Sequence, residues 1–324
     1  MNILIIKLIL LLFIIQLLFS LSRYITTEDR LLNSIVVQNE IKTFIQYPNE
    51  IMWKRVDHID EDNPFVFFHQ RKAGGTSIRH GLMIDSKNKH LSNYIMCYSI
   101  TICDDYHLPN DKKYAIYAGH FPWNSLIDLN RLHVNNVLNF SCTTNFREPI
   151  SRIKSCLYYR FSKEISDFQN KLSKNKTSQC LQYFPIYELE KLLTKRDKYG
   201  NSCLDEPFRI LSGFYDPDFT SYDGISFDLN DMIQAFRLTL HHITKCAPVV
   251  LELPHSYQLI AHRFPQFLYT FKESIHDNIN SDFSHCRNVS YSIEQEKLFK
   301  KYSVLERLLY KTIDTKISTM MLKS

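Results

Sequence analysis

The fold is decided by the stretch Phe65-Val66-Phe67-Phe68-His69-Gln70-Arg71-Lys72-Ala73-Gly74-Gly75-Thr76-Ser77-Ile78. Its four leading apolar residues follow an Asn-Pro pair and precede a glycine turn, a pattern typical of a short buried strand. Thr76 and Ser77 suit the first positions of a helix. Seven glycines occur in the chain, and Gly74-Gly75 is the one adjacent pair, which indicates an unusual backbone conformation there. We expect a strand, a glycine loop and a helix in succession.

This loop is suited to binding an anion. A strand that runs into a glycine loop and then a helix start presents free backbone N–H groups and the positive end of the helix dipole at one place. Lys72 adds a full positive charge. The ATP-binding loop is the obvious alternative, but it has the pattern G-x-x-x-x-G-K-[ST], with the lysine after the glycines. Here Lys72 precedes them, and a basic surface turn without a ligand also fits this stretch taken alone.

Further apolar runs predict the rest of a sheet. Residues 114–118 and 137–146 each have the pattern of a strand, and the second is followed through Pro149 by an amphipathic helix to about residue 166. Strands that alternate with helices favour an α/β fold with a parallel sheet covered on both faces. The second half is more helical, with helical spacing at 231–246 and 293–317 and one more strand at 249–253. We expect a single domain.

Two more motifs lie where strands end. In Tyr117-Ala118-Gly119-His120-Phe121-Pro122 a histidine follows a strand, so it points into the crevice where open parallel sheets bind ligands, and it can act as a base near neutral pH. At Arg147 another strand ends; Pro149 opens a helix, and Ser155 follows about two turns later. A guanidinium and a hydroxyl suit a phosphate, although Arg-Glu-Pro before a helix is by itself only a capping arrangement.

These motifs resemble those of one family in the same order, with the loop and the Arg147 motif about 75 residues apart. The stretch from His69 to Ile78 is similar to the 5′-phosphosulfate loop of Golgi membrane-bound carbohydrate sulfotransferases, written H-I-P-K-T-x-G-T-S-L, with Arg71 in place of proline. The stretch from Arg147 resembles the family's 3′-phosphate motif, R-[DE]-P-x-x-R-x-x-S-x-x-Y. The Gly-His pair resembles an element of heparan sulfate and uronyl O-sulfotransferases. The resemblance extends over residues 63–318 and implies a P-loop-like open parallel sheet flanked by helices.

The resemblance implies transfer of a sulfuryl group from 3′-phosphoadenosine 5′-phosphosulfate to a glycan hydroxyl, with no metal. His120 would take the proton of the acceptor hydroxyl, and Lys72 would stabilise the leaving phosphate. Arg152 is either structural or in contact with the ligand. Two alternatives stay open, a nucleotide-dependent kinase and an inactive luminal glycan-binding protein. The expected donor-binding residues are Arg71, Lys72, Ala73, Gly74, Gly75, Thr76, Ser77, Arg147 and Ser155.

The N-terminus indicates the compartment. Residues 3–21 are almost wholly apolar, long enough to span a bilayer core, although a cleaved signal peptide has a similar pattern. We expect a signal anchor at 1–22, a stem at 23–60 and the catalytic domain at 61–324. The chain is then a single-pass type II protein of the Golgi membrane with its domain in the lumen.

The cysteines and sequons agree with the lumen. Eight cysteines predict one or more disulfides of unknown connectivity, and Cys142 is expected to be a plain hydrophobe inside a strand. Sequons begin at Asn139, Asn175 and Asn288, and the first lies in an expected core strand. No cysteine or histidine spacing suits zinc. The net charge of +5 is compatible with an anionic substrate, and no aromatic-basic pattern indicates nucleic acid.

Overall fold

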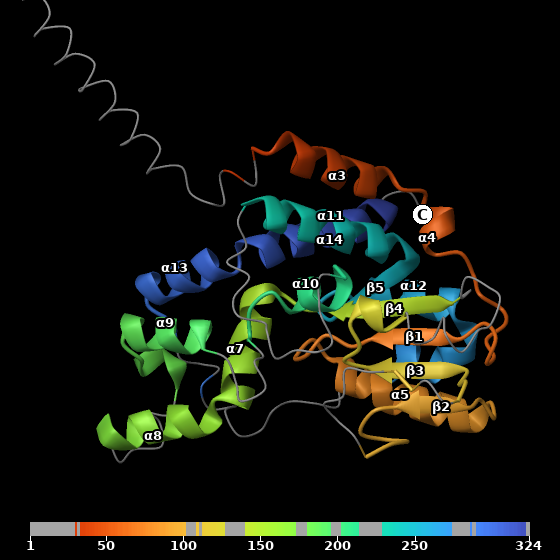
Figure 1. Ribbon diagram of the computed structural model, residues 1–324, viewed down its shortest axis with the longest axis horizontal. Helices are drawn as coiled ribbons and strands as arrows, with labels where there is room; N and C mark the ends of the chain where they lie inside the picture. Colours follow the sequence, from red (N-terminus) through yellow and green to blue (C-terminus); the bar gives the residue numbers. More distant parts are fainter. Residues whose placement is uncertain are drawn as a thin grey trace, which may run out of the picture.

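The computed structural model describes residues 30, 33–101, 108–109, 112–126, 140–172, 180–195, 202–213, 229–273, 286 and 290–321. It confirms the α/β fold: a five-stranded, fully parallel sheet is flanked by helices (Figure 1). The strands, in spatial order, are β2 (Asn93–Ile95), β3 (Ile116–Gly119), β1 (Phe65–Phe68), β4 (Ser141–Phe146) and β5 (Cys246–Val250).

Helices cover the sheet and extend beyond it. Helix α5 packs against β2 and β3, α11 packs against β4 and β5, and α3 and α14 back α11 (Figure 1). Helix α12 packs against β5 and meets the short segments η4 (Pro265–Phe267) and η5 (Tyr269–Glu273), which also contact α5. The α-helices among the described residues are α3 (Ile35–Gln46), α4 (Asn49–Met52), α5 (Gly75–Asn88), α7 (Pro149–Arg160), α8 (Ser162–Leu172), α9 (Ile186–Thr194), α10 (Glu206–Leu211), α11 (Leu229–Lys245), α12 (Pro254–Arg263), α13 (Ile293–Tyr302) and α14 (Val304–Met321).

The order of the strands determines where a ligand would bind. From the central β1 the chain passes to β2 and β3 on one side, and then crosses to β4 and β5 on the other. The direction of winding therefore reverses beside β1. Open parallel sheets bind ligands outside the carboxyl ends of their strands at such a reversal. The loop after β1 lies at this position, as do the ends of β3 and β4.

Two clusters of buried side chains hold the structure together. The larger surrounds the sheet, and all four residues of β1 are fully buried in it. The smaller joins α7, α9 and α13 through residues such as Leu157, Leu193 and Phe299, and lies beside the sheet on the side of α7 (Figure 1). Because α7 begins directly after β4, this helical part stands next to the carboxyl ends of the strands.

The described part of the segment before β1, where a stem is expected at 23–60, contains the helices α3 and α4. Helix α3 begins after Ser34, whose hydroxyl accepts from the Val37 amide, and it contacts α11 and α14. Val37 and Phe44, seven residues apart on one helical face, are buried in the main cluster. The described part of this segment is therefore packed on the domain.

Disulfides cross-link both parts of the molecule. Cys142 does not behave as a plain hydrophobe, because it is bonded to Cys246 across the neighbouring strands β4 and β5. The prediction failed because the pairing depends on strand order, which the local sequence does not carry. Cys97 is also disulfide-bonded. Two further bonds, Cys156–Cys203 and Cys180–Cys286, tie the helical part together.

Several expectations fall on residues outside the described ranges. The anchor at 1–22 is one, and Asn139, Asn175 and Asn288 of the sequons are others. Within the described ranges, no helix is both long enough and apolar enough to cross a bilayer.

Candidate functional site

The loop between β1 and α5 has the special backbone that its glycines predict. Gly74 has φ +83°, and Lys72 adopts a left-handed φ of 61°, which is uncommon for a residue with a side chain. Helix α5 begins at Gly75, where a Cβ atom would overlap Cδ2 and Nε2 of the His69 ring. The ring of His69 therefore packs directly on the first residue of the helix, which leaves room for no residue but glycine there.

The end of β4 holds this loop in place. Asn145 accepts a hydrogen bond from the Gln70 amide at 2.8 Å and donates to the Ala73 carbonyl at 2.7 Å and the Gln70 carbonyl at 3.2 Å. Thr144 donates to the Phe68 carbonyl at 2.9 Å and accepts from the Gln70 side chain at 3.1 Å. Asn145 is fully buried. It was not among the predicted site residues, although a polar Thr-Thr-Asn run inside a buried strand was an available signal.

Arg147 contacts the loop at Lys72. Arg147 follows β4 and donates from Nη1 to the Lys72 carbonyl at 3.3 Å. Its Nε lies 3.9 Å from a carboxylate oxygen of Glu252. Glu148 accepts from the Ile150 and Ser151 amides and so caps α7. The hydrogen bond from Arg147 therefore joins the loop to the residues that lead into α7.

Lys72 leans toward α7. Its Nζ lies 4.4 Å from the centroid of the Tyr159 ring, and Tyr159 follows Ser155 by four residues, which places both on one face of the helix. Ser155 is half-buried. Burial, and secondarily the charge of Arg147, lowers the pKa of Lys72. An anion placed between the lysine and the arginine would relieve their repulsion.

His120 and His69 form a stacked pair at the ends of β3 and β1. Their ring centroids lie 4.2 Å apart with an interplanar angle of 26°. His120 Nδ1 lies 2.9 Å from the His69 carbonyl oxygen, which can only accept, so Nδ1 carries the proton and Nε2 keeps a lone pair. Burial, followed by the charges of Arg71 and Arg79, lowers the pKa of His120 well below its ordinary 6.5. The ring is therefore neutral at physiological pH.

The remaining predicted residues of the loop differ in how far they are buried. Thr76 and Ser77 are half-buried in the first turn of α5, and the Thr76 carbonyl accepts from the Tyr98 hydroxyl at 3.2 Å. Ala73 is fully buried, so it contributes main chain and no accessible side chain. The amides of this first turn have no partner within their own helix, as in every α-helix.

Two arginines of the motifs point into the protein. The Arg71 guanidinium pairs with Glu206 at 3.2 Å, and its side chain is 8% exposed. Arg152, left open between structural and ligand-binding roles, is structural: it makes two hydrogen bonds with Glu306, at 3.0 and 2.6 Å, and a third with the Cys203 carbonyl. Arg71 thus contributes its backbone to the loop, while its side chain points into the protein and pairs with Glu206.

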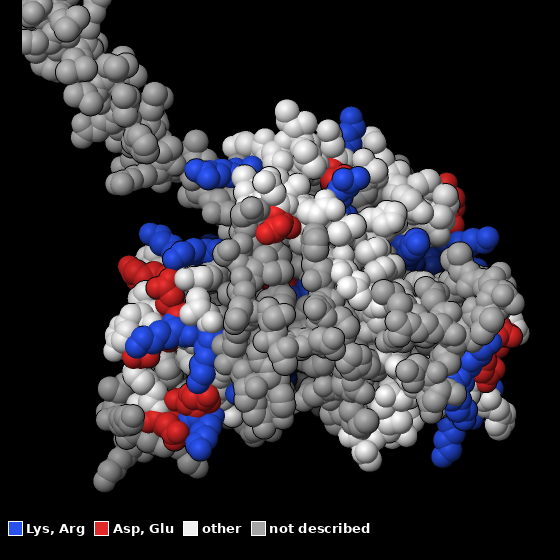
Figure 2. Space-filling model, in the orientation of Figure 1, with Lys and Arg blue, Asp and Glu red and all other residues white. Residues whose placement is uncertain are grey.

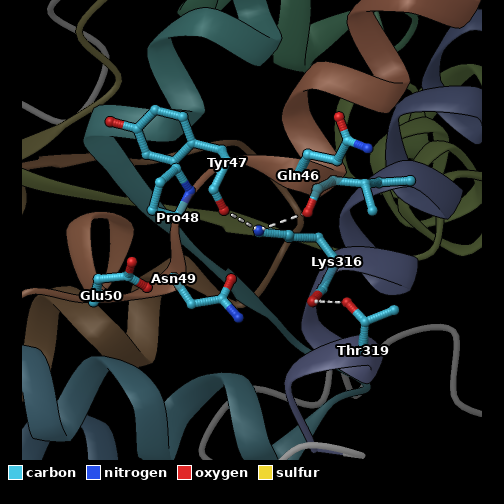
Figure 3. A pocket seen from close by; sticks show the side chains of 8 residues that line it. Gln46, Tyr47, Pro48, Asn49, Glu50, Lys316 and Thr319 are labelled. Atoms are coloured by element: carbon cyan, nitrogen blue, oxygen red, sulfur yellow. Dashed lines mark hydrogen bonds between the residues drawn. The ribbon is translucent and has the colours of Figure 1, made fainter.

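A pocket of about 440 Å³ lies elsewhere, where α14 meets the turn between α3 and α4 (Figure 3). Lys316 projects into this turn and donates to the carbonyls of Ile45 and Tyr47. These bonds place a positive charge at the carbonyl end of α3, where it is favourable. No residue of the three motifs lines this pocket, so we assign it a structural role in joining the two ends of the described chain.

The surface charges over α8 and α9 do not indicate a binding site for an anionic polymer. Figure 2 shows acidic and basic side chains intermixed over the end that carries α8 and α9. Because these charges are paired, this face presents no uniform positive field to an anionic polymer. The pairs are Lys195–Glu164 at 2.8 Å, Lys191–Glu188 at 3.3 Å and Lys301–Glu190 at 2.9 Å.

Comparisons add no family to this geometry. No protein-family model matches the chain, and no curated protein matches its sequence. Among the described residues there is no group of three or more His, Cys, Asp or Glu side chains arranged to hold a metal ion. The site must therefore be interpreted from its own residues.

Proposed function

We propose that this protein transfers a sulfuryl group from 3′-phosphoadenosine 5′-phosphosulfate to a hydroxyl of a glycan. The observation that carries the proposal is the hydrogen bond from Arg147 to the Lys72 carbonyl, because it joins the two motifs, which lie 75 residues apart. His120 ends the neighbouring strand and is tied to the same loop through His69. A donor with phosphates at both ends of its ribose suits two adjacent cationic positions.

In this proposal the loop holds the 5′ end of the donor. The amides of Gly74 and Gly75 and the hydroxyls of Thr76 and Ser77 surround the 5′-phosphate at the positive end of α5. Arg147 and Ser155 bind the 3′-phosphate, which supplies the distinction from ATP. Backbone amides and a guanidinium fork are the donors that suit phosphate oxygens.

The chemistry is an in-line displacement at sulfur. His120 Nε2 takes the proton of the acceptor hydroxyl as its oxygen forms a bond to sulfur, and the bond from sulfur to the bridging phosphate oxygen breaks. The electron pair of that bond passes to the leaving 3′,5′-adenosine bisphosphate. Lys72 turns from Tyr159 to the bridging oxygen, where it stabilises the growing negative charge. The Nδ1 hydrogen bond of His120 fixes the tautomer that this step needs.

The acceptor and the location follow from the same proposal. A glycan is favoured over a tyrosine because the resemblance is to enzymes with a histidine base. The buried disulfides favour an oxidising compartment such as the Golgi lumen. The apolar segment 1–22 is proposed as the anchor that holds the chain there.

Two substitutions separate binding from chemistry. His120→Ala should abolish turnover and leave affinity for 3′,5′-adenosine bisphosphate largely intact, whereas Arg147→Ala should weaken that affinity. Matched controls are His241→Ala and Arg237→Ala, which replace an exposed histidine and an arginine that is 58% exposed. Normal turnover in purified His120→Ala would remove the base assignment. Donor binding by the wild type with no transfer to any polysaccharide tested would favour the inactive glycan-binding alternative.

A further inference from the structure

We infer that Glu206 is a positioning residue for the donor loop and that its pairing with Arg71 replaces the rigidity that proline supplies in the family's loop motif. The inference rests on the proposed function for its catalytic consequence. Its structural half, that Glu206 fixes the loop, stands on the contacts alone.

Glu206 contacts the loop at both the main chain and the side chain of Arg71. Its Oε1 accepts from the Arg71 amide at 3.4 Å and from Arg71 Nη1 at 3.2 Å. Both residues are buried, with 7% of Arg71 and 2% of Glu206 exposed. Charge pairs at this depth are screened little by solvent, so losing one partner removes a strong interaction from the other.

Glu206 is itself held rigidly from a distant part of the chain. Its second oxygen, Oε2, pairs with Arg209 one turn later in α10, and Arg209 also donates to the Ser202 carbonyl at 2.8 Å. Burial alone would raise the pKa of Glu206, but Arg209, and next Arg71, hold it well below its ordinary value. The segment is anchored by the Cys156–Cys203 disulfide to α7. The carboxylate is therefore ionised and fixed before a ligand arrives.

Arg71 stands at the position where the family's loop motif has proline. Proline would fix φ at this position, and arginine does not. Asn145 secures the Gln70 amide and the Ala73 carbonyl, on either side of Arg71 and Lys72. Glu206 secures the residue between those two points, immediately before Lys72 with its left-handed φ of 61°. Without Glu206 the backbone next to Lys72 would lose one of its restraints, and the lysine would be directed less precisely at the leaving group.

The test compares Glu206→Gln with Glu306→Gln. Both carboxylates are 2% exposed and both pair with a buried arginine, but Glu306 pairs with Arg152 and does not touch the loop. Hydrogen exchange at the Gln70 and Arg71 amides is measured without ligand, and affinity for 3′,5′-adenosine bisphosphate is measured by calorimetry. We expect faster exchange and about tenfold weaker binding in Glu206→Gln only, a difference of one decade in the dissociation constant.

A second variant covers a failure of Glu206→Gln to fold. Arg71→Lys keeps the charge and loses the planar fork, so it should show a smaller increase in exchange and a smaller loss of affinity. Equal exchange in Glu206→Gln and Glu306→Gln, or wild-type exchange in Arg71→Lys, overturns the inference. If exchange rises as expected but the wild type binds no 3′,5′-adenosine bisphosphate, the positioning role stands and the proposed function fails.

Discussion

Replacing Gly75 with alanine should disturb the histidine pair through a single added methyl group. The new Cβ would overlap Cδ2 and Nε2 of His69. That ring has little room to move away, because it stacks at 4.2 Å on His120 and at 5.7 Å on Phe67. The substitution therefore forces His69, and with it His120, out of the observed arrangement.

The expected loss of stability follows from the cost of adding atoms to a packed site. Adding a methylene-sized group to a filled site costs about 1–3 kcal/mol in the free energy of unfolding. Gly75 is the first residue of α5, where alanine gains less helix stability than in the interior. We expect a loss within that range, together with a fall in turnover of at least about tenfold, since a misplaced catalytic group costs that much or more.

Gly81→Ala is the matched control within the same helix. Its Cβ would lie 2.8 Å from the Thr270 Cα, so it also crowds a neighbour, but it does not touch the histidine pair. Urea denaturation gives the stability of each variant, and turnover is measured per folded molecule. Both variants should lose stability, and only Gly75→Ala should lose turnover. A Gly75→Ala protein with wild-type stability and turnover would refute the packing of His69 on this helix.

Three further predictions concern single interactions. Because Lys72 leaves Tyr159 to reach the bridging oxygen, Tyr159→Leu removes a contact made only before the reaction and should raise turnover about two- to fivefold, the value of an exposed cation–π contact, while Tyr159→Phe should not, as steady-state kinetics would reveal. Burial lowers the pKa values of His69 and His120 well below 6.5, so their contribution to stability is complete above about pH 6.5 and is lost as the pH falls. Urea titrations should show that the free energy of unfolding falls less steeply between pH 7 and pH 5 when both histidines are replaced by glutamine. An unchanged slope would contradict this. Arg152→Met should cost about 3–5 kcal/mol by leaving a buried carboxylate unpaired, with donor affinity of the folded fraction unchanged.

The sequence predicted the centre of the fold best. Its local signals were clear: an apolar run, a glycine pair after it, and a second apolar run that ends near Gly119. The structure has β1, the start of α5 and β3 at these places. The three-residue β2 was missed because it is short and partly polar. The last strand was expected at 249–253 and forms at Cys246–Val250; it includes Pro248, which an edge strand tolerates.

Helix α3 was missed for a different reason. Its apolar residues Val37, Ile41 and Phe44 have helical spacing, but polar residues around them suggested a stem. Only the packing against α11 and α14 makes that face buried. The disulfide pairings could not be predicted from the sequence either, because eight cysteines allow many connectivities and the fold selects among them.

The candidate site was predictable as separate motifs and not as a connected structure. Lys72, His120 and Arg147 were predicted as site residues from their motifs after strands and from the family resemblance. Asn145 had one local signal, the polar Thr-Thr-Asn run in a buried strand, whereas Glu206, which fixes the loop from 135 residues away, carries no local signal of that role. Long-range partners of this kind depend on the fold, so a single sequence does not reveal them.

The preference between two nucleotides tests the central claim most directly. Thermal unfolding of the wild type is followed with 3′,5′-adenosine bisphosphate and with ATP at equal concentrations, and a ligand that binds the native state raises the transition temperature. The proposed sulfotransferase site predicts clear stabilisation by the bisphosphate, little by ATP, and loss of that difference in Arg147→Ala. Equal stabilisation by both nucleotides, or a preference for ATP, would contradict it.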